Sequence, residues 1–155
     1  MCGRRSDARG VLILLNNNFQ FREVGVVTDP NGNFIILTLQ IDDNVFTLVS
    51  LYGPNNDDPD FFETILHELS TINCDYFILC GDWNAVQDYP IDCFNYRNQN
   101  NVRASRSISN LKAILKLCDA WRIKNPDKTS YTWFRKNPVK RARLDYFLIT
   151  EELMN

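Results

Sequence analysis

Short runs of β-branched and aromatic residues follow one another through the N-terminal half of the chain, and tight turns separate them. The strongest turn signal is residues 29–33 (DPNGN), where proline fixes one φ angle and glycine permits another. This turn joins the run at residues 22–28 to the run at 34–40, and residues 42–44 join the latter to 45–51. Runs of this composition joined by tight turns predict an antiparallel β-meander.

Apolar residues recur at helical spacing in two later segments. The first is expected to begin at Pro59, with Asp58 as its N-cap. The second is expected over residues 106–117. The apolar stripes consist of Phe62, Ile65, Leu66 and Leu69 in the first segment and of Leu111, Ile114 and Leu115 in the second. Both segments therefore predict amphipathic helices that pack one face against a core.

Four further apolar runs predict strands. Residues 11–15 are bounded by asparagines and predict a buried strand, and residues 76–80 predict a strand in the middle of a sheet. Residues 131–134 and 144–149 predict two more strands, while residues 86–104 are rich in Asn and Asp and predict a long loop. Many strands with few intervening helices predict a mixed α+β sandwich.

Composition and charge narrow the class of protein. The chain has 155 residues, of which 45% are hydrophobic and 23% charged, which fits one globular domain with a core. Residues 1–94 carry 4 Lys and Arg against 14 Asp and Glu, whereas residues 95–155 carry 13 against 5. This split fits an acidic, cation-binding part and a basic, phosphate-binding part, or solvated surface alone. No apolar run approaches the roughly 20 residues of a membrane helix, and no secretory signal is visible.

Histidine and cysteine usage limits the possible chemistry further. The sequence has one histidine, His67, which lies off the apolar stripe of the first predicted helix and is expected to be exposed. A site that needs an imidazole has to use this residue or one from outside the chain. The five cysteines contain no Cys-x-x-Cys pair, so the usual spacing of a zinc ribbon is absent.

Three polar clusters lie at or within the predicted strands: residues 52–55 (YGPN), residues 81–84 (GDWN) and Asp145. Asp82 and Asn84 are two residues apart, so on an extended segment both side chains point to the same face. A carboxylate that orients water beside an amide that holds a phosphate suits Mg²⁺-assisted cleavage of a phosphodiester. The same residue types are also ordinary turn formers after a strand, and this alternative stays open.

Asp145 and the basic segment before it each allow two interpretations. An acid inside an apolar strand is costly unless it is paired, so Asp145 belongs either to a functional site or to an ion pair with Arg141 or Arg143. Residues 135–143 carry five cations beside Trp133. Such a segment suits the backbone of a nucleic acid, or it is a solvated loop.

Six short motifs occur in a fixed order along the chain. They are RGVLIL at residues 9–14, LYGPN at 51–55, CGDWN at 80–84, DAWR at 119–122, YTWF at 131–134 and RLDYFLI at 143–149. Together they resemble the endonuclease domain of non-LTR retrotransposons, which belongs to the DNase-I-like endonuclease/exonuclease/phosphatase superfamily. The resemblance implies a four-layer α/β-sandwich, with two packed mixed sheets flanked by helices. It implies a partial domain over residues 9–155 that is incomplete at both termini, after a short lead-in at residues 1–8.

The resemblance also implies roles for individual residues. Tyr52 resembles a phosphate-contacting tyrosine, and Asp82 resembles the aspartate that activates water or handles leaving-group protons. Asn84 resembles a phosphate-orienting asparagine, and Asp145 resembles the aspartate that orients the catalytic histidine. The implied substrate-binding residues are Thr132, Trp133, Arg135, Lys136, Lys140, Arg141 and Arg143.

The departures from the family pattern shape the expected function. An asparagine and a metal-binding glutamate would lie upstream of Arg9, and a Ser-Asp-His motif would follow the last strand, but none of them is present. The resemblance therefore implies a Mg²⁺-dependent DNA endonuclease whose metal site is incomplete and whose activity is absent or impaired. The expected partners are DNA and a reverse transcriptase domain on the same polypeptide, inside the nucleus and away from membranes. The alternatives are a non-catalytic nucleic-acid-binding remnant and a phosphatase for small phosphoesters.

Overall fold

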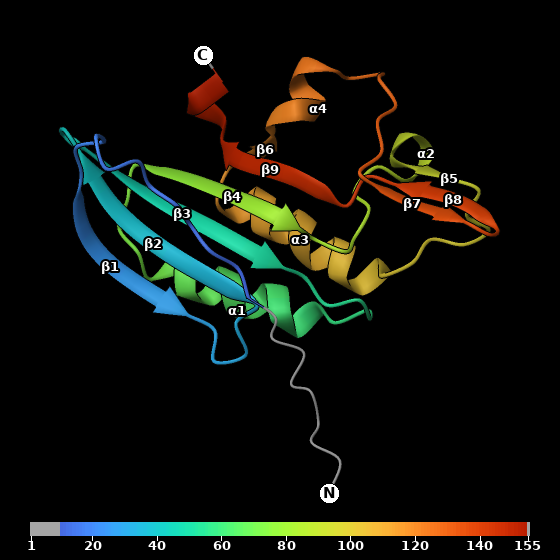
Figure 1. The fold of residues 1–155 in the computed structure, drawn as a ribbon, viewed down its shortest axis with the longest axis horizontal. Coiled ribbons are helices and arrows are strands. Elements are labelled where there is room, and N and C mark those ends of the chain that lie inside the picture. Colours follow the sequence, from blue (N-terminus) through green and yellow to red (C-terminus); the bar gives the residue numbers. More distant parts are fainter. Residues whose placement is uncertain (1–9, 155) are drawn as a thin grey trace, which may run out of the picture.

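The computed structural model describes residues 10–154, which form two sheets and several helices (Figure 1). The larger sheet has the strand order β1-β2-β3-β4-β9-β6, and the smaller sheet has the order β5-β8-β7. The larger sheet consists of β1 (Arg22–Thr28), β2 (Phe34–Ile41), β3 (Asn44–Tyr52), β4 (Tyr76–Asp82), β9 (Asp145–Thr150) and β6 (Leu117–Asp119). The smaller sheet consists of β5 (Cys93–Phe94), β8 (Val139–Ala142) and β7 (Trp133–Lys136). The helices are α1 (Pro59–Ser70), α2 (Tyr89–Asp92), α3 (Val102–Ile114), α4 (Ala120–Lys124) and a 3₁₀ helix, η1 (Glu151–Met154).

The predicted meander is confirmed, because β1, β2 and β3 pair antiparallel in chain order. In the turn between β1 and β2, the Gly32 N–H donates to the Asp29 carbonyl at 2.9 Å, and Gly32 adopts a φ of 74° that glycine tolerates. Strand β4 then pairs parallel to β3, and α1 makes the crossover that a parallel connection needs. The apolar run at residues 76–80 therefore lies in the middle of the sheet, as predicted.

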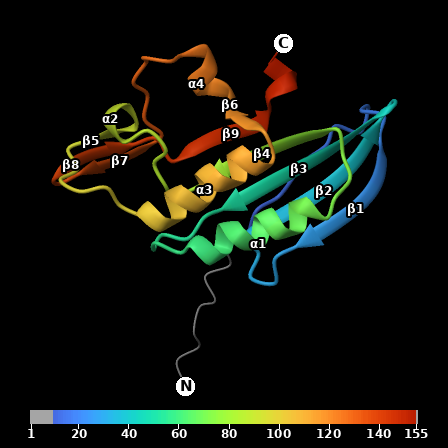
Figure 2. The same ribbon diagram turned by 180° about the vertical axis from the view of Figure 1, so that it is seen from behind.

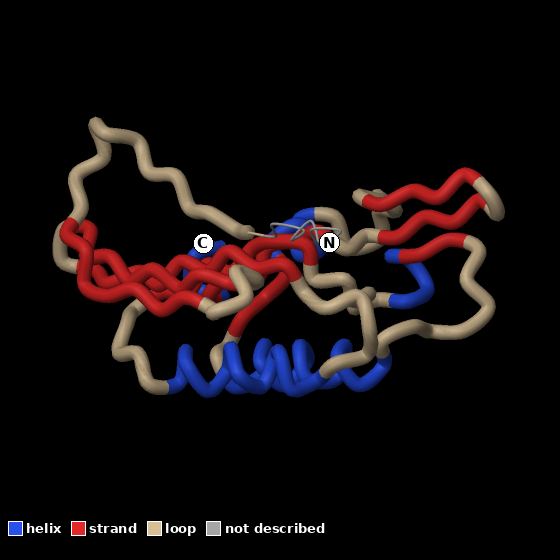
Figure 3. The backbone as a smooth tube through the Cα atoms, turned by 60° about the horizontal axis from the view of Figure 1, so that its bottom comes forward, coloured by secondary structure: helices blue, strands red, loops and turns tan. Residues whose placement is uncertain are grey.

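Helices α1 and α3 lie side by side on one face of the larger sheet (Figure 3). The predicted N-terminus of α1 is correct, with Pro59 as its first residue, and His67 on this helix is exposed as predicted. The buried helix residues that face the sheet are Phe62, Ile65 and Leu69 of α1 and Ala104, Ile108 and Leu111 of α3. Each such large apolar side chain contributes about 1.5–3 kcal/mol when it is fully buried, so this helix–sheet layer is the main core.

Residues 10–21 run over the opposite face of the larger sheet (Figures 1 and 3). The predicted strand at residues 11–15 is wrong, since this segment forms no ladder with any described residue. Leu12 is 64% exposed and Leu14 is 85% exposed. An apolar run indicates a buried strand only when a partner strand lies beside it, and the run itself does not report that partner.

The second predicted helix differs from α3 in position and in phase. Helix α3 begins at Val102 rather than at residue 106, after Asn101 in a left-handed conformation, and Ile114 is 54% exposed. The side chains that face the core include small ones, Ala104 and Ser105, which an apolar stripe does not reveal. The short elements α2, β5, β6 and α4 carry too few residues for a periodic pattern, and the sequence did not predict them.

The α+β class is confirmed, and the described residues show how its layers lie. The smaller sheet lies beyond one end of the larger sheet, as Figures 1 and 2 show from opposite sides. Within residues 10–154, the larger sheet has a helical layer on one face only. The predicted lead-in at residues 1–8 lies outside the described residues. In this part of the chain, no helix is long and apolar enough to span a membrane.

Candidate active site

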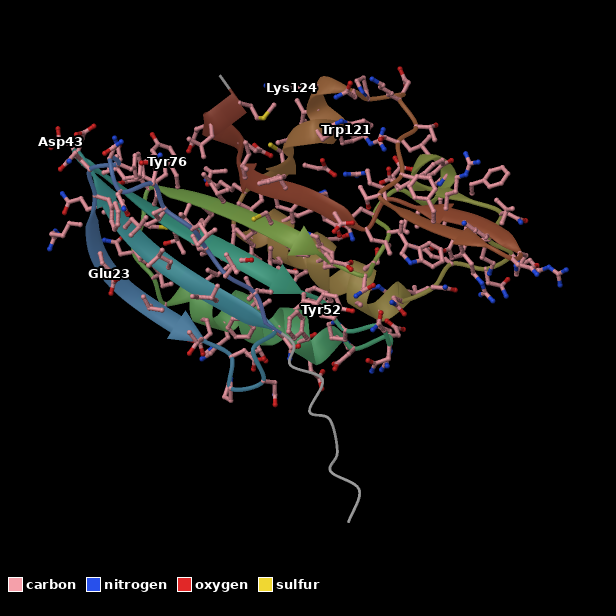
Figure 4. All side chains as sticks on the ribbon, viewed as in Figure 1. Glu23, Asp43, Tyr52, Tyr76, Trp121 and Lys124 are labelled. Atoms are coloured by element: carbon pink, nitrogen blue, oxygen red, sulfur yellow. The ribbon has the colours of Figure 1, made fainter. Side chains whose placement is uncertain are left out.

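Three of the predicted site residues lie side by side on neighbouring strands. Tyr52 at the end of β3 pairs with Asp82 at the end of β4, and Asp82 pairs with Asp145 at the start of β9. Paired residues on adjacent strands share a face and lie about 5 Å apart, so the three side chains form one row, which we call the polar row. The row lies on the face opposite α1 and α3, and Figure 4 shows Tyr52 at its end of the sheet.

Two glycines allow the strand ends that carry the polar row to approach closely. Gly81 has a φ of 148°, and a Cβ atom built there would lie 1.9 Å from the Leu51 carbonyl oxygen. A Cβ atom on Gly53 would lie 2.5 Å from the carbonyl oxygen of Trp83. The space freed by glycine lets the Gly53 N–H donate to the Asp82 carbonyl at 2.7 Å. The glycines in YGPN and GDWN are therefore needed to bring Tyr52 and Asp82 together.

Trp83 anchors the loop that presents Asp82 and Asn84. Its side chain is fully buried, its indole N–H donates to the Tyr146 carbonyl at 3.0 Å, and its ring stacks on the Tyr146 ring at 5.0 Å. Trp83 is buried on the helix side, whereas Asp82 follows the alternation of β4 and lies on the outer side. The prediction that Asp82 and Asn84 share a face assumed an extended segment, whereas the chain bends at Asn84.

Asn84 is tied to both neighbouring loops. It adopts a φ of 49°, which asparagine tolerates better than most residues, and its backbone N–H donates to Asp82 Oδ1 at 3.0 Å. Its side-chain nitrogen donates to the Gly53 carbonyl at 2.8 Å. An amide nitrogen carries two hydrogens, and this contact uses one of them.

Asp145 is exposed and is the first residue of β9, and Thr132 fixes the backbone at this point. The Thr132 hydroxyl accepts from the backbone N–H groups of Leu144 and Asp145 at 3.0 and 3.1 Å. Among the described residues, Asp145 makes no ion pair with Arg141 or Arg143. The structural alternative of an ion pair is therefore wrong for this residue, and its carboxylate is free to act with Asp82.

The surroundings of Asp82 disfavour its charge. Partial burial raises the pKa of its carboxyl above the ordinary value of 3.8, and the neighbouring Asp145 adds to this effect. The Asn84 N–H that donates to this carboxylate opposes the rise in pKa. A carboxylate whose charge is disfavoured is a better proton acceptor, which suits a group that takes a proton from water.

Replacing Asp82 by asparagine is therefore expected to raise the free energy of unfolding at neutral pH. The folded-state pKa lies above the ordinary value of 3.8, so the unfolded chain ionises first and stability falls as pH rises through this range. Denaturant unfolding of both proteins at about pH 7 and about pH 3 measures the effect. The gain should vanish at the lower pH, and an equal gain at both values would contradict this account.

The predicted basic segment forms a hairpin of β7 and β8. Trp133 is 37% exposed and Phe134 is 62% exposed, while Arg135, Lys136 and Arg141 are also exposed. The guanidinium of Arg141 lies 5.9 Å from the Phe134 ring centroid. Exposed cations beside exposed aromatic rings are the side chains that contact a nucleic-acid strand.

Arg143 is the exception, and its prediction as a DNA contact is wrong. It is 3% exposed, and its Nε and Nη2 atoms donate to the two carboxylate oxygens of Asp92, each at 2.8 Å. Its Nη2 atom also donates to Asp119 at 2.6 Å, and Arg122 forms a further ion pair with Asp92. A guanidinium buried between two carboxylates cannot reach a ligand.

A cavity of about 230 Å³ lies between the polar row and the hairpin. Its lining includes Asn84, Trp133 and Leu144, together with Asn101, whose role was not predicted. The Asn101 side-chain nitrogen donates to the Asn84 carbonyl at 2.8 Å, and this contact fixes the loop after β4. No signal in the sequence marked this residue, because residues 86–104 were predicted to be a loop and the helix was expected to begin only at residue 106.

The described residues do not complete a magnesium site. They contain no cluster of three or more His, Cys, Asp or Glu side chains that could hold a metal ion. Asp82 and Asp145 supply a pair of adjacent carboxylates, which falls short of the usual oxygen ligand set without further groups. His67 belongs to α1 on the opposite face of the sheet, so it does not bring an imidazole to Asp145.

Known proteins resemble this chain in part of their sequence or in their fold. No family model matches the chain. The chain is 26% identical over 152 residues to the transposon TX1 uncharacterized 149 kDa protein of Xenopus laevis. The matched region covers 94% of this chain and 11% of that protein. The chain is thus similar to a small part of a much longer transposon protein.

Solved structures agree in fold. An AP endonuclease from Archaeoglobus fulgidus matches with a TM-score of 0.69 and 17% identity, over 86% of this chain and 61% of that one. The 3′ phosphatase NExo from Neisseria, bound to a product DNA hairpin, matches with a TM-score of 0.65 and 18% identity, over 86% and 61% of the two chains. The endonuclease domain of TRAS1, a telomere-specific non-LTR retrotransposon, matches with a TM-score of 0.58 and 19% identity, over 84% and 57%.

The chain spans about three fifths of the length of these solved structures. Matches at this level of identity establish a shared fold, and the resemblance seen in the sequence motifs is confirmed at that level. The chain therefore has the DNase-I-like fold, which it shares with AP endonucleases and with the endonuclease domain of a non-LTR retrotransposon.

Proposed function

We propose that the chain is part of a DNA endonuclease that hydrolyses a phosphodiester of target DNA at the polar row. The observation that carries this proposal is the placement of Tyr52, Asp82 and Asp145 in one row. Asn84 lies beside the row, next to a hairpin of exposed cations and aromatic rings. We also propose a role in a retroelement, with a reverse transcriptase domain on the same polypeptide and action in the nucleus. The match to a small part of a longer transposon protein supports the retroelement role.

In the proposed reaction, each side chain has one task. The Tyr52 hydroxyl and the free amide hydrogen of Asn84 hold oxygens of the scissile phosphate. Asp82 accepts a proton from the attacking water as the water oxygen bonds to phosphorus, and the negative charge of Asp145 beside it strengthens Asp82 as a base. The bond from phosphorus to the leaving sugar oxygen breaks, and that oxygen takes a proton from solvent. The DNA strand runs from this row toward the hairpin, where Trp133, Arg135 and Arg141 contact it.

The resemblance implies that the reaction depends on Mg²⁺, and the described residues contribute the pair Asp82 and Asp145 toward it. A metal would stabilise charge on the phosphate, but its ligand set is incomplete within residues 10–154. The single histidine lies elsewhere in the fold, so Asp145 has no imidazole to orient. We therefore propose that the 155-residue chain alone cleaves DNA slowly or not at all.

Plasmid nicking in the presence of Mg²⁺ tests this proposal. One sample is the 155-residue chain, and the other is a form extended at both ends to include the upstream metal-binding glutamate and the downstream Ser-Asp-His motif. We expect nicking by the extended form and little by the shorter one. Robust nicking by the shorter form would contradict the proposed impairment, and failure of both would leave only the non-catalytic reading.

The competing function is a phosphatase for small phosphoesters. DNA binding by the β7–β8 hairpin distinguishes an endonuclease from such a phosphatase. Replacing Lys140 and Arg141 by alanine should weaken duplex binding, because each removed phosphate contact lowers the slope of log K against log salt by about 1. Fluorescence anisotropy at several salt concentrations measures both quantities. The matched control is Lys124→Ala with Lys128→Ala, which removes the same charge from exposed positions near α4. Equal slopes for the two double variants would remove the hairpin from the DNA interface.

A further inference from the structure

A second and larger cavity lies beside the hairpin, and the proposed reaction does not use it. Its volume is about 460 Å³, and its lining includes Tyr96, Arg97, Asn100, Pro138 and Lys140. It is formed by the segment between β5 and α3 on one side and by the end of the β7–β8 hairpin on the other. Figures 1 and 2 both show this segment beside the hairpin.

The loop at residues 95–100 is attached to the hairpin by specific contacts. The Asn95 side-chain nitrogen donates to the Val139 carbonyl at 2.6 Å. The Lys140 ammonium lies 4.8 Å from the centroid of the Tyr96 ring. The two walls of the cavity are therefore connected to each other, and the half-buried Tyr96 ring is held at the joint.

This cavity is next to the one that holds Asn84. Tyr96 and Asn100 line both, so the two cavities meet along these side chains. A strand whose phosphate lies at Asn84 can continue past Trp133 and Tyr96 without leaving the lined surface. The larger cavity is thus positioned for the part of a substrate that lies next to the reacting group.

Both walls carry positive charge and no acidic residue. The segment between β5 and α3 contains Arg97, and the β7–β8 hairpin contains Arg135, Lys136, Lys140 and Arg141. The cavity lining itself combines two cations, a tyrosine ring and several asparagine amides. Proteins that bind single-stranded nucleic acid combine cations, which contact the phosphate backbone, with aromatic rings, on which the bases stack.

We propose that this cavity binds an unpaired nucleotide of a DNA strand that continues from the polar row, with Tyr96 as the stacking surface and Arg97 and Lys140 at the backbone. This inference rests on the proposed function for the path of the strand. The cavity volume is within the range of small-ligand pockets. A base inside a regular duplex cannot stack on a side chain, so the subsite selects DNA that is single-stranded at this position.

Binding of a fluorescently labelled oligo-dT strand, measured by anisotropy in EDTA, tests the subsite without any cleavage. Tyr96→Ala and Tyr96→Leu should each weaken binding of this strand at least about five-fold, because one base–aromatic stack is lost. Tyr96→Phe should bind as the wild type does. A regular duplex of the same length should be affected less by all three variants.

A matched pair of charge variants separates the cavity from general charge. Arg97→Ala and Arg106→Ala remove the same charge from exposed positions, but only Arg97 lines the cavity. We expect the first to weaken binding of the single strand more than the second. Equal effects of the two, or unchanged binding by Tyr96→Ala and Tyr96→Leu, would overturn the proposal. Because no cleavage is measured, these outcomes are independent of whether the polar row hydrolyses DNA.

Discussion

Replacing Arg143 by methionine is expected to lower the free energy of unfolding by about 3–5 kcal/mol, the usual cost of removing one partner from a buried ion pair. The guanidinium lies between Asp92, which is fully buried, and Asp119, which is 6% exposed. Without it, both carboxylates lose a charged hydrogen-bond donor in a place that water does not reach. A loss of this size is a large share of the roughly 5–15 kcal/mol that stabilises a domain.

The same substitution also loosens three parts of the fold at once. Asp92 ends α2, Asp119 ends β6, and Arg143 connects β8 to β9, so the ion pairs join the smaller sheet to the larger one. Denaturant unfolding measures the loss, and Arg141→Met is the matched control because Arg141 is an exposed cation two residues away. The control should change the free energy of unfolding by less than about 0.5 kcal/mol. Similar losses for both variants would contradict a special role for Arg143.

The sequence singled out Tyr52, Asp82 and Asp145 because each is a polar residue at the end of an apolar run or within one, which is a local feature. Tyr52 follows an apolar run and precedes Gly53. Asp82 follows another apolar run and Gly81, and Asp145 lies within a third apolar run. The pairing of β3, β4 and β9 that brings the three residues into one row is a feature of the fold that no local pattern predicted. Their chemical roles stay predictions.

The errors arose where distant partners decide the outcome. Arg143 looked like one more cation of the hairpin, because nothing near it in sequence reveals Asp92, which lies 51 positions away. Residues 11–15 looked like a strand, because an apolar run does not report whether a ladder partner exists. The phase of α3 was misjudged because Ala104 and Ser105 face the core through small size rather than through hydrophobicity.

Replacing Asp82 by alanine is expected to have the largest effect on cleavage. Asp82 is the member of the polar row that lies between the other two, and removing a positioned proton acceptor typically lowers the rate 10²–10⁴-fold. The substitution removes a half-buried charge that disfavours folding, so the variant should remain folded. Loss of cleavage would then reflect chemistry and not loss of structure.

Asp43→Ala is the matched control for this substitution. Asp43 is an exposed aspartate in the turn between β2 and β3, and Figure 4 shows it at the end of the larger sheet away from Tyr52. Both variants remove one carboxylate from the same sheet, and only Asp82 belongs to the polar row.

The most direct measurement is the rate of plasmid nicking with Mg²⁺ by the extended form of the chain, compared among wild type, Asp43→Ala and Asp82→Ala. The account predicts equal rates for wild type and Asp43→Ala, and a rate lower by at least about 10²-fold for Asp82→Ala. If Asp82→Ala nicks the plasmid as fast as Asp43→Ala, the polar row is not the site of phosphodiester hydrolysis.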